Sequence, residues 1–270
     1  MKTDSSQGCS STIYRGKEGY LNTTVNLIGD LVDIPVGCTN FPFIFTLASS
    51  LPSSFNGKFG HIVYNMEAVL DFTDSCCKKV HRLFYVQNLY NLNLEPELKL
   101  PVQSDKIKEF LSFCCRKSRF LMSVSIPYTG YTSAQNIKVS IRLANESNIN
   151  IEKTTISIRK VVSYNVKRVC KRDIETLVIS CVEGVESNCS KNIEYNLKIP
   201  ETVTNINKQN STIIQVEYDL IVSCIPEGCH FSSKLKIPIT IGNIPLAFDE
   251  KPQQNDTITS KDYLDTGSTF

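Results

Sequence analysis

The side chains that most often carry out catalysis are sparse in this sequence. Histidine occurs only at His61, His81 and His230. The sequence contains neither a Gly-x-Ser-x-Gly nucleophile elbow nor a glycine-rich phosphate loop. Its carboxylates are scattered rather than gathered near turns, so no acid–base pair can be assigned. The sequence therefore predicts a protein that is not an enzyme and needs no cofactor.

Cysteine and histidine come close together near residue 226. Cys224, Cys229 and His230 flank an expected turn there, and Cys181 and Cys189 flank another. A structural zinc site takes four ligands, usually as two close pairs. Because the Cys-x4-Cys-His spacing supplies only three candidates, we expect these cysteines to act as small apolar residues and expect no metal.

The use of cysteine indicates a reducing compartment. The chain has 11 cysteines, an odd number, and four of them form the adjacent pairs Cys76-Cys77 and Cys114-Cys115. The first residues after Met1 lack the apolar core of a signal peptide. We therefore expect reduced thiols and a cytoplasmic protein.

Glycosylation sequons favour an alternative, a secreted β-sandwich module that serves adhesion or reception. Asn-x-Ser/Thr triplets begin at Asn22, Asn145, Asn188, Asn210 and Asn255. Asn- and Ser-rich loops also produce such triplets by chance, and a cytoplasmic chain would leave them unmodified.

A run of basic residues is the first candidate for a binding site. It comprises Arg159, Lys160, Lys167, Arg168, Lys171 and Arg172. Only Asp173 and Glu175 follow as acidic partners. Arginine grips a phosphate with two hydrogen bonds, and each basic residue near an anionic leaflet contributes ~1 kcal/mol. The run predicts contact with anionic lipid or phosphate; the alternative is a solvated loop face.

The hydrophobic pattern is that of β-strands. Apolar residues alternate with polar ones in the stretches 120–126, 137–143, 149–158, 177–179, 214–222 and 235–241. This period of two places apolar side chains on one face of a sheet. The one helical candidate is Ser104–Phe113, which starts with a Ser-Asp cap. The sequence predicts an all-β sandwich protein.

Changes of pattern divide the chain into three parts. We expect a partial front sandwich over residues 1–110, a fuller rear sandwich over 111–248, and a disordered tail over 249–270. In the front part, an aromatic strand at Phe41–Phe45 and a strand carrying Ile62 and Tyr64 have inner faces that need a partner sheet, and we expect part of this apolar face and at least one strand edge to be open. Gly57 and Gly60 suit a turn with positive φ between them.

Two segments resemble signatures of the alpha-arrestins, the arrestin-domain-containing adaptors. The first joins Phe41–Phe45 to the stretch 51–64. The second runs from Ile126-Pro127-Tyr128-Thr129-Gly130-Tyr131 through Asn145-Glu146-Ser147 to Ile241-Gly242-Asn243-Ile244-Pro245-Leu246. Asn56 stands where the family usually has Glu, and Ala134-Gln135 replaces a Gly-Glu pair. The resemblance implies two immunoglobulin-like β-sandwich domains of the arrestin type. The first is expected to be incomplete, since family members carry strands ahead of the segment at 20–30.

The resemblance also implies a function. Such a protein is expected to be a non-enzymatic adaptor that binds membrane receptors or transporters as cargo. It would act in protein transport, endocytic sorting or signalling down-regulation, in the cytoplasm or at the plasma membrane or endosomes. Family tails recruit ubiquitin ligases through Pro-Pro-x-Tyr, a motif missing from residues 249–270. The net charge of +2 gives no reason to expect nucleic acid. A truncated gene product without independent function is a further alternative.

Overall fold

The protein is nearly all β. The computed structural model describes residues 13–29, 31–73, 76–111 and 117–248. The strands in these residues are β1 (Phe55–Gly57), β2 (Gly60–Ile62), β3 (Tyr64–Asp71), β4 (Cys77–Phe84), β5 (Val102–Leu111), β6 (Lys117–Ile126), β7 (Gly130–Thr132), β8 (Asn136–Glu146), β9 (Ile151–Val166), β10 (Val169–Val185), β11 (Ser190–Lys198), β12 (Ile214–Pro226) and β13 (Ser233–Gly242). Two short 3-10 helices, η1 (Leu92–Leu94) and η2 (Pro96–Lys99), precede β5.

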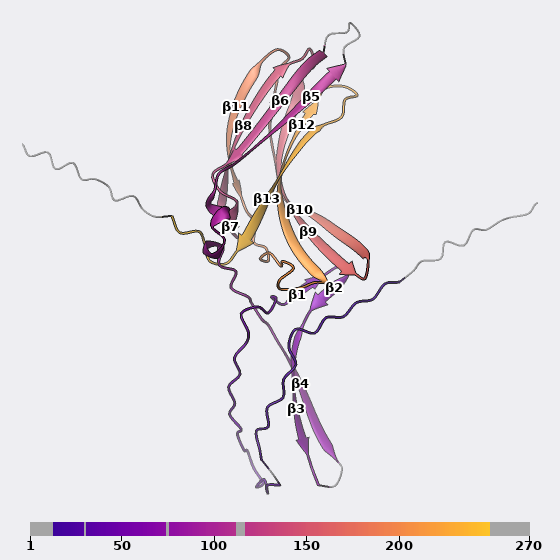
Figure 1. The fold of residues 1–270 in the computed structure, drawn as a ribbon, viewed down its shortest axis with the longest axis vertical. Helices are drawn as coiled ribbons and strands as arrows, with labels where there is room; N and C mark the ends of the chain where they lie inside the picture. The colour runs from indigo at the N-terminus through magenta and orange to yellow at the C-terminus, as the bar shows by residue number, and fades with distance from the viewer. Residues whose placement is uncertain (1–12, 30, 74–75, 112–116, 249–270) are drawn as a thin grey trace, which may run out of the picture.

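The rear part is a sandwich of two sheets (Figure 1). One sheet has the strand order β10-β9-β12-β13-β7, and the other has the order β11-β8-β6-β5. Neighbouring strands are antiparallel, except that β7 runs parallel to β13. The inner faces of both sheets share one apolar core.

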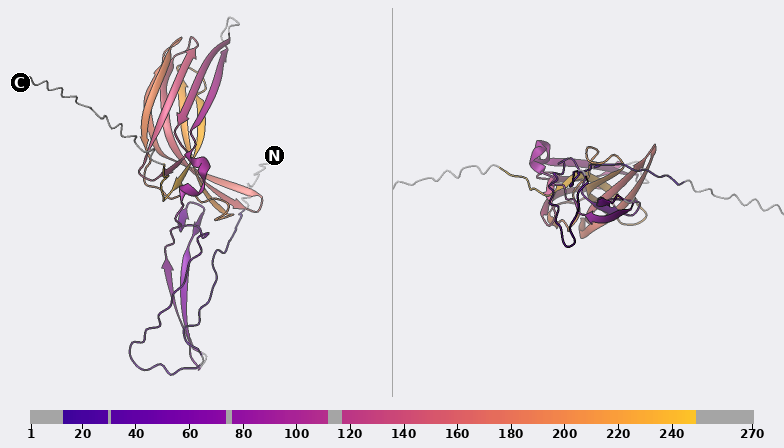
Figure 2. Two further views of the ribbon diagram at one scale, coloured as in Figure 1. Left: turned by 60° about the vertical axis from the view of Figure 1, so that its left-hand side comes forward. Right: turned by 90° about the horizontal axis from the view of Figure 1, so that it is seen from below.

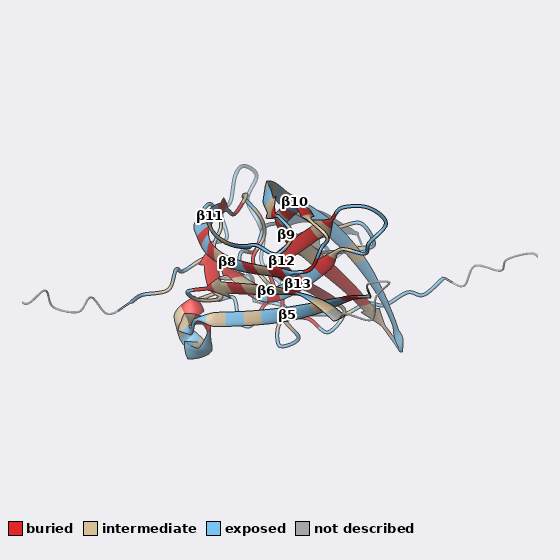
Figure 3. Ribbon diagram, turned by 90° about the horizontal axis from the view of Figure 1, so that it is seen from above, coloured by how far each residue is buried: buried red, intermediate tan, exposed pale blue. Residues whose placement is uncertain are grey.

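Alternation along the strands produces this core. In β6, Phe120, Met122 and Val124 are fully buried, whereas the residues between them are half-buried. Inner residues of β12 pack against them from the opposite sheet. Cys224 Sγ of β12 lies 3.4 Å from Met122 Sδ of β6. Buried positions line the interior of the sandwich (Figure 3). Full burial of each large aliphatic side chain contributes about 1.5–3 kcal/mol.

The six expected rear strands are confirmed as β6, β8, β9, β10, β12 and β13, but the expected helix at Ser104–Phe113 is wrong. In the described residues this stretch belongs to β5, which pairs with β6 in a register that aligns Ile107 with Leu121. As an edge strand, β5 turns Ile107 outward and polar Ser104 inward, so its period of two is hidden in the sequence. Pairing with β6 outweighs the local Ser-Asp capping signal.

β5 (Val102–Leu111) crosses the expected boundary between residues 110 and 111 and belongs to the rear sheet. The division into three parts stays a prediction. The expected tail, residues 249–270, lies outside the described residues.

The front part contains two separate hairpins, β1–β2 and β3–β4. Residues 13–29 and 31–53 contain no strand and run beside the β3–β4 hairpin, which projects away from the sandwich (Figures 1 and 2). The expected strand at Phe41–Phe45 is therefore wrong. Phe43 and Phe45 are 47% and 40% exposed, whereas Ile62 and Tyr64 are buried in the common core. Among the residues that the structure describes, no strand pairs with this extended segment, and its aromatic side chains therefore have no sheet to pack on.

The turn between β1 and β2 uses its glycines for space. Neither Gly57 nor Gly60 has a positive φ, so that expectation is wrong. A Cβ at Gly57 would instead collide with the Tyr164 hydroxyl of β9 and the Phe55 ring. The glycine is needed because the backbone passes close to these aromatic side chains.

The Ile-Gly-Asn-Ile-Pro-Leu stretch at residues 241–246 attaches residues 90–93, which precede β5, to the rear sandwich. A Cβ at Gly242 would lie 2.7 Å from Leu92 Cγ, and Leu92 is fully buried. Asn243 Oδ1 accepts a 3.0 Å hydrogen bond from the Tyr90 amide. Asn93 donates to the Pro245 carbonyl at 2.8 Å. These contacts join residues 90–93 to the end of β13.

Candidate anion-binding site

The predicted basic residues lie on the long β9–β10 hairpin. The strands align from Val166 opposite Val169 to Ile151 opposite Val185. Lys167 and Arg168 form the turn between them, where both are exposed and Lys167 has a φ of 57°. This hairpin end reaches beyond the sandwich toward β1 and β2 (Figure 1).

Two of the six residues already have partners on the inner side. Lys160 Nζ lies 2.6 Å from the Glu175 carboxylate. The ammonium of Lys171 lies over the Phe59 ring, 3.7 Å from its centroid. Pairing of this kind lowers their capacity to bind a further anion.

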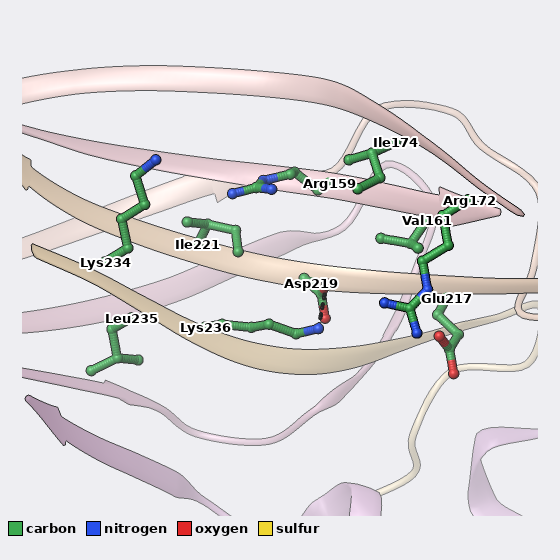
Figure 4. A pocket seen from close by; sticks show the side chains of 10 residues that line it. All are labelled: Arg159, Val161, Arg172, Ile174, Glu217, Asp219, Ile221, Lys234, Leu235 and Lys236. Carbon is green, nitrogen blue, oxygen red and sulfur yellow. Dashed lines mark ion pairs between the residues drawn. The ribbon is translucent and has the colours of Figure 1, made fainter. Parts of the chain in front are cut away.

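Arg159 and Arg172 lie on the opposite face of the sheet. Residue 159 is directly followed by Lys160, and neighbouring residues of a strand point to opposite faces. Both arginines border a cavity of about 280 Å³ (Figure 4). Its lining comprises Arg159, Val161, Arg172, Ile174, Glu217, Asp219, Ile221, Lys234, Leu235 and Lys236. We call this the sheet cavity.

The sheet cavity carries more positive than negative groups. Lys236 Nζ is 2.8 Å from the buried Asp219 carboxylate, which is 8% exposed. Figure 4 shows Arg172 and Glu217 on one side of the cavity. Within the described residues, no ion pair involves Arg159, Arg172 or Lys234. The guanidinium groups of Arg159 and Arg172 can bind a carboxylate or phosphate bidentately.

Sequence reasoning missed Lys234 and Lys236. They alternate with buried Leu235 and Ile237 on β13, more than 60 residues away from Arg172. The only sign of them in the sequence is that they take the outward positions of an alternating strand. The register that aligns Lys236 with Ile221 brings them to the cavity.

The cysteine and histidine candidates do not converge. Cys224 is buried beside Thr154 and Met122, whereas Cys229 and His230 are exposed in the loop after β12. Cys181 is exposed on β10, and Cys189 is exposed in the loop before β11. In the parts of the chain with described placement, no three His, Cys, Asp or Glu side chains gather as metal ligands.

A polar contact near the start of the described chain was also missed. Glu18 accepts hydrogen bonds from the Thr212 hydroxyl at 2.8 Å, the Thr212 amide at 3.0 Å and the Tyr20 hydroxyl at 2.9 Å. Burial acts to raise the Glu18 pKa, but these hydrogen bonds outweigh it and hold the pKa below its usual value. The segment around Glu18 is thereby anchored to the loop before β12.

Comparison with known proteins now defines the class. The model for "Arrestin (or S-antigen), C-terminal domain" matches residues 116–246, and the model for the N-terminal domain matches residues 2–93. Together they cover most of the chain, in the order that the two parts of the fold have. The chain belongs to the arrestin family.

Its curated relatives are arrestin domain-containing proteins. It is 28% identical to arrestin domain-containing protein 1 of Homo sapiens over 88% of this chain and 54% of that protein. It is 26% identical to arrestin domain-containing protein 17 of Caenorhabditis elegans over 78% of this chain and 50% of the relative. The chain spans about half the length of these relatives. None of the helices in the described residues is long and apolar enough to cross a membrane.

Proposed function

We propose that this chain is a non-enzymatic, arrestin-like adaptor in the cytoplasm. It binds cytoplasmic parts of membrane receptors or transporters and takes part in protein transport, endocytic sorting or signalling down-regulation. The observation that carries this proposal is the match to both arrestin domains in their family order. Within the described residues, the end strand β10 of the five-stranded sheet pairs on one side alone, which gives such a protein a surface for partner segments.

The buried position of Asn145 argues against the secreted alternative. This sequon residue is 2% exposed. Its amide donates to the carbonyls of Ile149 and Glu186, at 2.9 Å each. A glycan would replace one of the two hydrogens on this nitrogen and so remove one of these hydrogen bonds, at a position with almost no access to solvent.

Proximity labelling tests the adaptor proposal. The full chain, fused to a biotin ligase and expressed in cells, should label integral membrane proteins and sorting proteins above a ligase-only control. Absence of this enrichment would remove the adaptor proposal. Glycosidase treatment of the expressed chain tests the secreted alternative, which requires a shift in gel mobility.

A weak contact with anionic membrane forms the second part of the proposal. Lys167 and Arg168 are the two of the six basic residues that the turn presents to solvent. Near an anionic leaflet each contributes ~1 kcal/mol, so the pair gives roughly a 30-fold preference for the membrane. Arg159, Lys160, Lys171 and Arg172 lie along the hairpin behind them.

Vesicle binding tests this contact. Replacing Lys167 and Arg168 with Ala should lower partition into phosphatidylserine vesicles by about 30-fold at low salt. The matched control replaces Lys198 and Lys208, two exposed lysines in other parts of the chain. Equal loss in both variants would show that only net charge matters.

A further inference from the structure

The outer edge of β10 is an open template for strand pairing. β10 is the first strand of its sheet and pairs with β9 on one side. Across the described part of the chain, no strand pairs with its other side. From Val169 to Thr176, every residue except Asp173 is exposed. Alternate backbone N–H and C=O groups of this β10 edge therefore remain free to bind an added strand.

Charge on the β10 edge favours an acidic partner. Its acidic residues are paired with basic ones, since Glu175 lies 2.6 Å from Lys160 of β9 and Asp173 lies 4.0 Å from Lys58 in the β1–β2 turn. Arg172 has no ion pair within the described residues. The exposed turn before the edge adds two further positive charges. The edge thus has a surplus of positive charge.

We propose that the β10 edge from Val169 to Thr176 binds an extended acidic segment of a partner protein by strand addition. The inference rests on the proposed function, because the segment would belong to a captured membrane protein. Backbone hydrogen bonds supply affinity in this mode, and alternate side chains supply specificity.

The outer face of the edge selects the side chains of the added strand. Arg172 and Ile174 lie two residues apart on this face and both border the sheet cavity. An added strand places a residue directly beside each of them. A carboxylate beside Arg172 gains a charge-assisted hydrogen bond, and an aliphatic side chain beside Ile174 covers apolar surface that is 55% exposed in Ile174. The segment therefore carries an acidic and an aliphatic residue separated by one position.

A peptide binding assay on the full chain tests the proposal. The probe is a fluorescent ten-residue peptide with Glu and Ile two positions apart in a Ser/Thr frame. A second peptide has Lys in place of Glu, and a third carries N-methyl groups at alternate amides. The Glu peptide should bind at least tenfold more tightly than the other two, because Lys in place of Glu loses the charge-assisted hydrogen bond to Arg172 and N-methylation removes the backbone donors.

Variants of the protein locate the site. R172E should reverse the preference between the Glu and Lys peptides, and I174K should weaken binding at least tenfold. I179K is the matched control, since Ile179 is a similarly exposed residue of the same strand beyond its irregular register. It should leave the affinity within twofold. Equal binding of the Glu and Lys peptides to the unmodified chain, or no binding by either, would overturn the proposal without the use of any variant.

The alternative occupant and the proposed function have separate outcomes. If the N-methylated peptide binds as tightly as its parent and phosphatidylserine vesicles displace both, the edge is a general anion site and strand addition is wrong. If proximity labelling of membrane proteins persists in R172E and I174K, the adaptor function stands and the β10 edge is not its docking site. If R172E and I174K lose the labelling of membrane proteins and I179K retains it, the result supports both the adaptor function and the β10 edge as its docking site.

Discussion

The ammonium of Lys171 lies 3.7 Å from the ring centroid of Phe59, so a side chain of β10 covers the turn of the β1–β2 hairpin. The same ring packs edge-on against Tyr164 of β9, with centroids 5.5 Å apart. Through this contact the front hairpin is attached to the rear sandwich. It also gives the ammonium of exposed Lys171 a partner within the protein.

Removal of this cation–π pair should loosen the attachment. F59A and K171M should each lower the free energy of unfolding, and a double-mutant cycle should give a coupling of about 0.5–1 kcal/mol. Urea denaturation of the two single variants and the double variant measures it. K167A is the control, because Lys167 has no ring contact among the described residues. Full additivity of F59A and K171M would show that the two side chains do not interact.

Ala134 occupies a turn conformation that suits glycine. Its φ is 66°, and the turn is held by a 3.0 Å hydrogen bond from the Thr132 amide to Gln135 Oε1. A left-handed conformation costs a non-glycine residue about 1–2 kcal/mol, partly offset by the greater freedom of glycine in the unfolded chain. A134G should therefore raise the free energy of unfolding by about 0.5–1 kcal/mol.

The matched control for this change is A144G within β8. There the backbone is regular strand, and glycine should lower the free energy of unfolding by about 0.5–1 kcal/mol. Denaturation midpoints of the two variants should move in opposite directions. Movement in the same direction would refute the strain assigned to Ala134.

The anchor at Glu18 should weaken in acid. Because the folded pKa lies below the usual 4.5, its contribution is complete above pH 4.5 and is lost as the pH falls through the folded pKa. Hydrogen exchange at Thr212 and Ile213, corrected for intrinsic rates, should show protection that falls in this acidic range. E18Q should remove this pH dependence. A parallel loss of protection at Leu220 in the core would indicate global unfolding instead.

Cys224 should be the least reactive of the described thiols. Burial raises its pKa to about 11 from a usual 9.0, so the thiolate fraction at pH 8 falls about 100-fold. Alkylation of the native chain by iodoacetamide, followed by mass spectrometry, should modify exposed Cys229 at least 100-fold faster. The difference should vanish in guanidinium. Equal rates in the native state would mean that the interior near Met122 opens readily.

The sequence by itself determined the strands of the rear sandwich and the family. Alternation such as Phe120, Met122 and Val124 is a local property, because each residue's face follows from its position along the strand. The Ile-Gly-Asn-Ile-Pro-Leu stretch at 241–246 likewise marks the family without knowledge of its partners. Its role in holding Leu92 emerged from the structure alone.

Tertiary structure decided the binding surface. Arg159 and Lys160 are neighbours in the sequence, yet the pleat sends one to the sheet cavity and the other to Glu175. Lys236 reaches the same cavity through strand register, and Glu18 meets Thr212 across 194 residues. A charge pattern shows which residues are basic. Which of them are neutralised depends on side chains brought close by pairing and packing between distant strands, and local sequence carries no record of those distances.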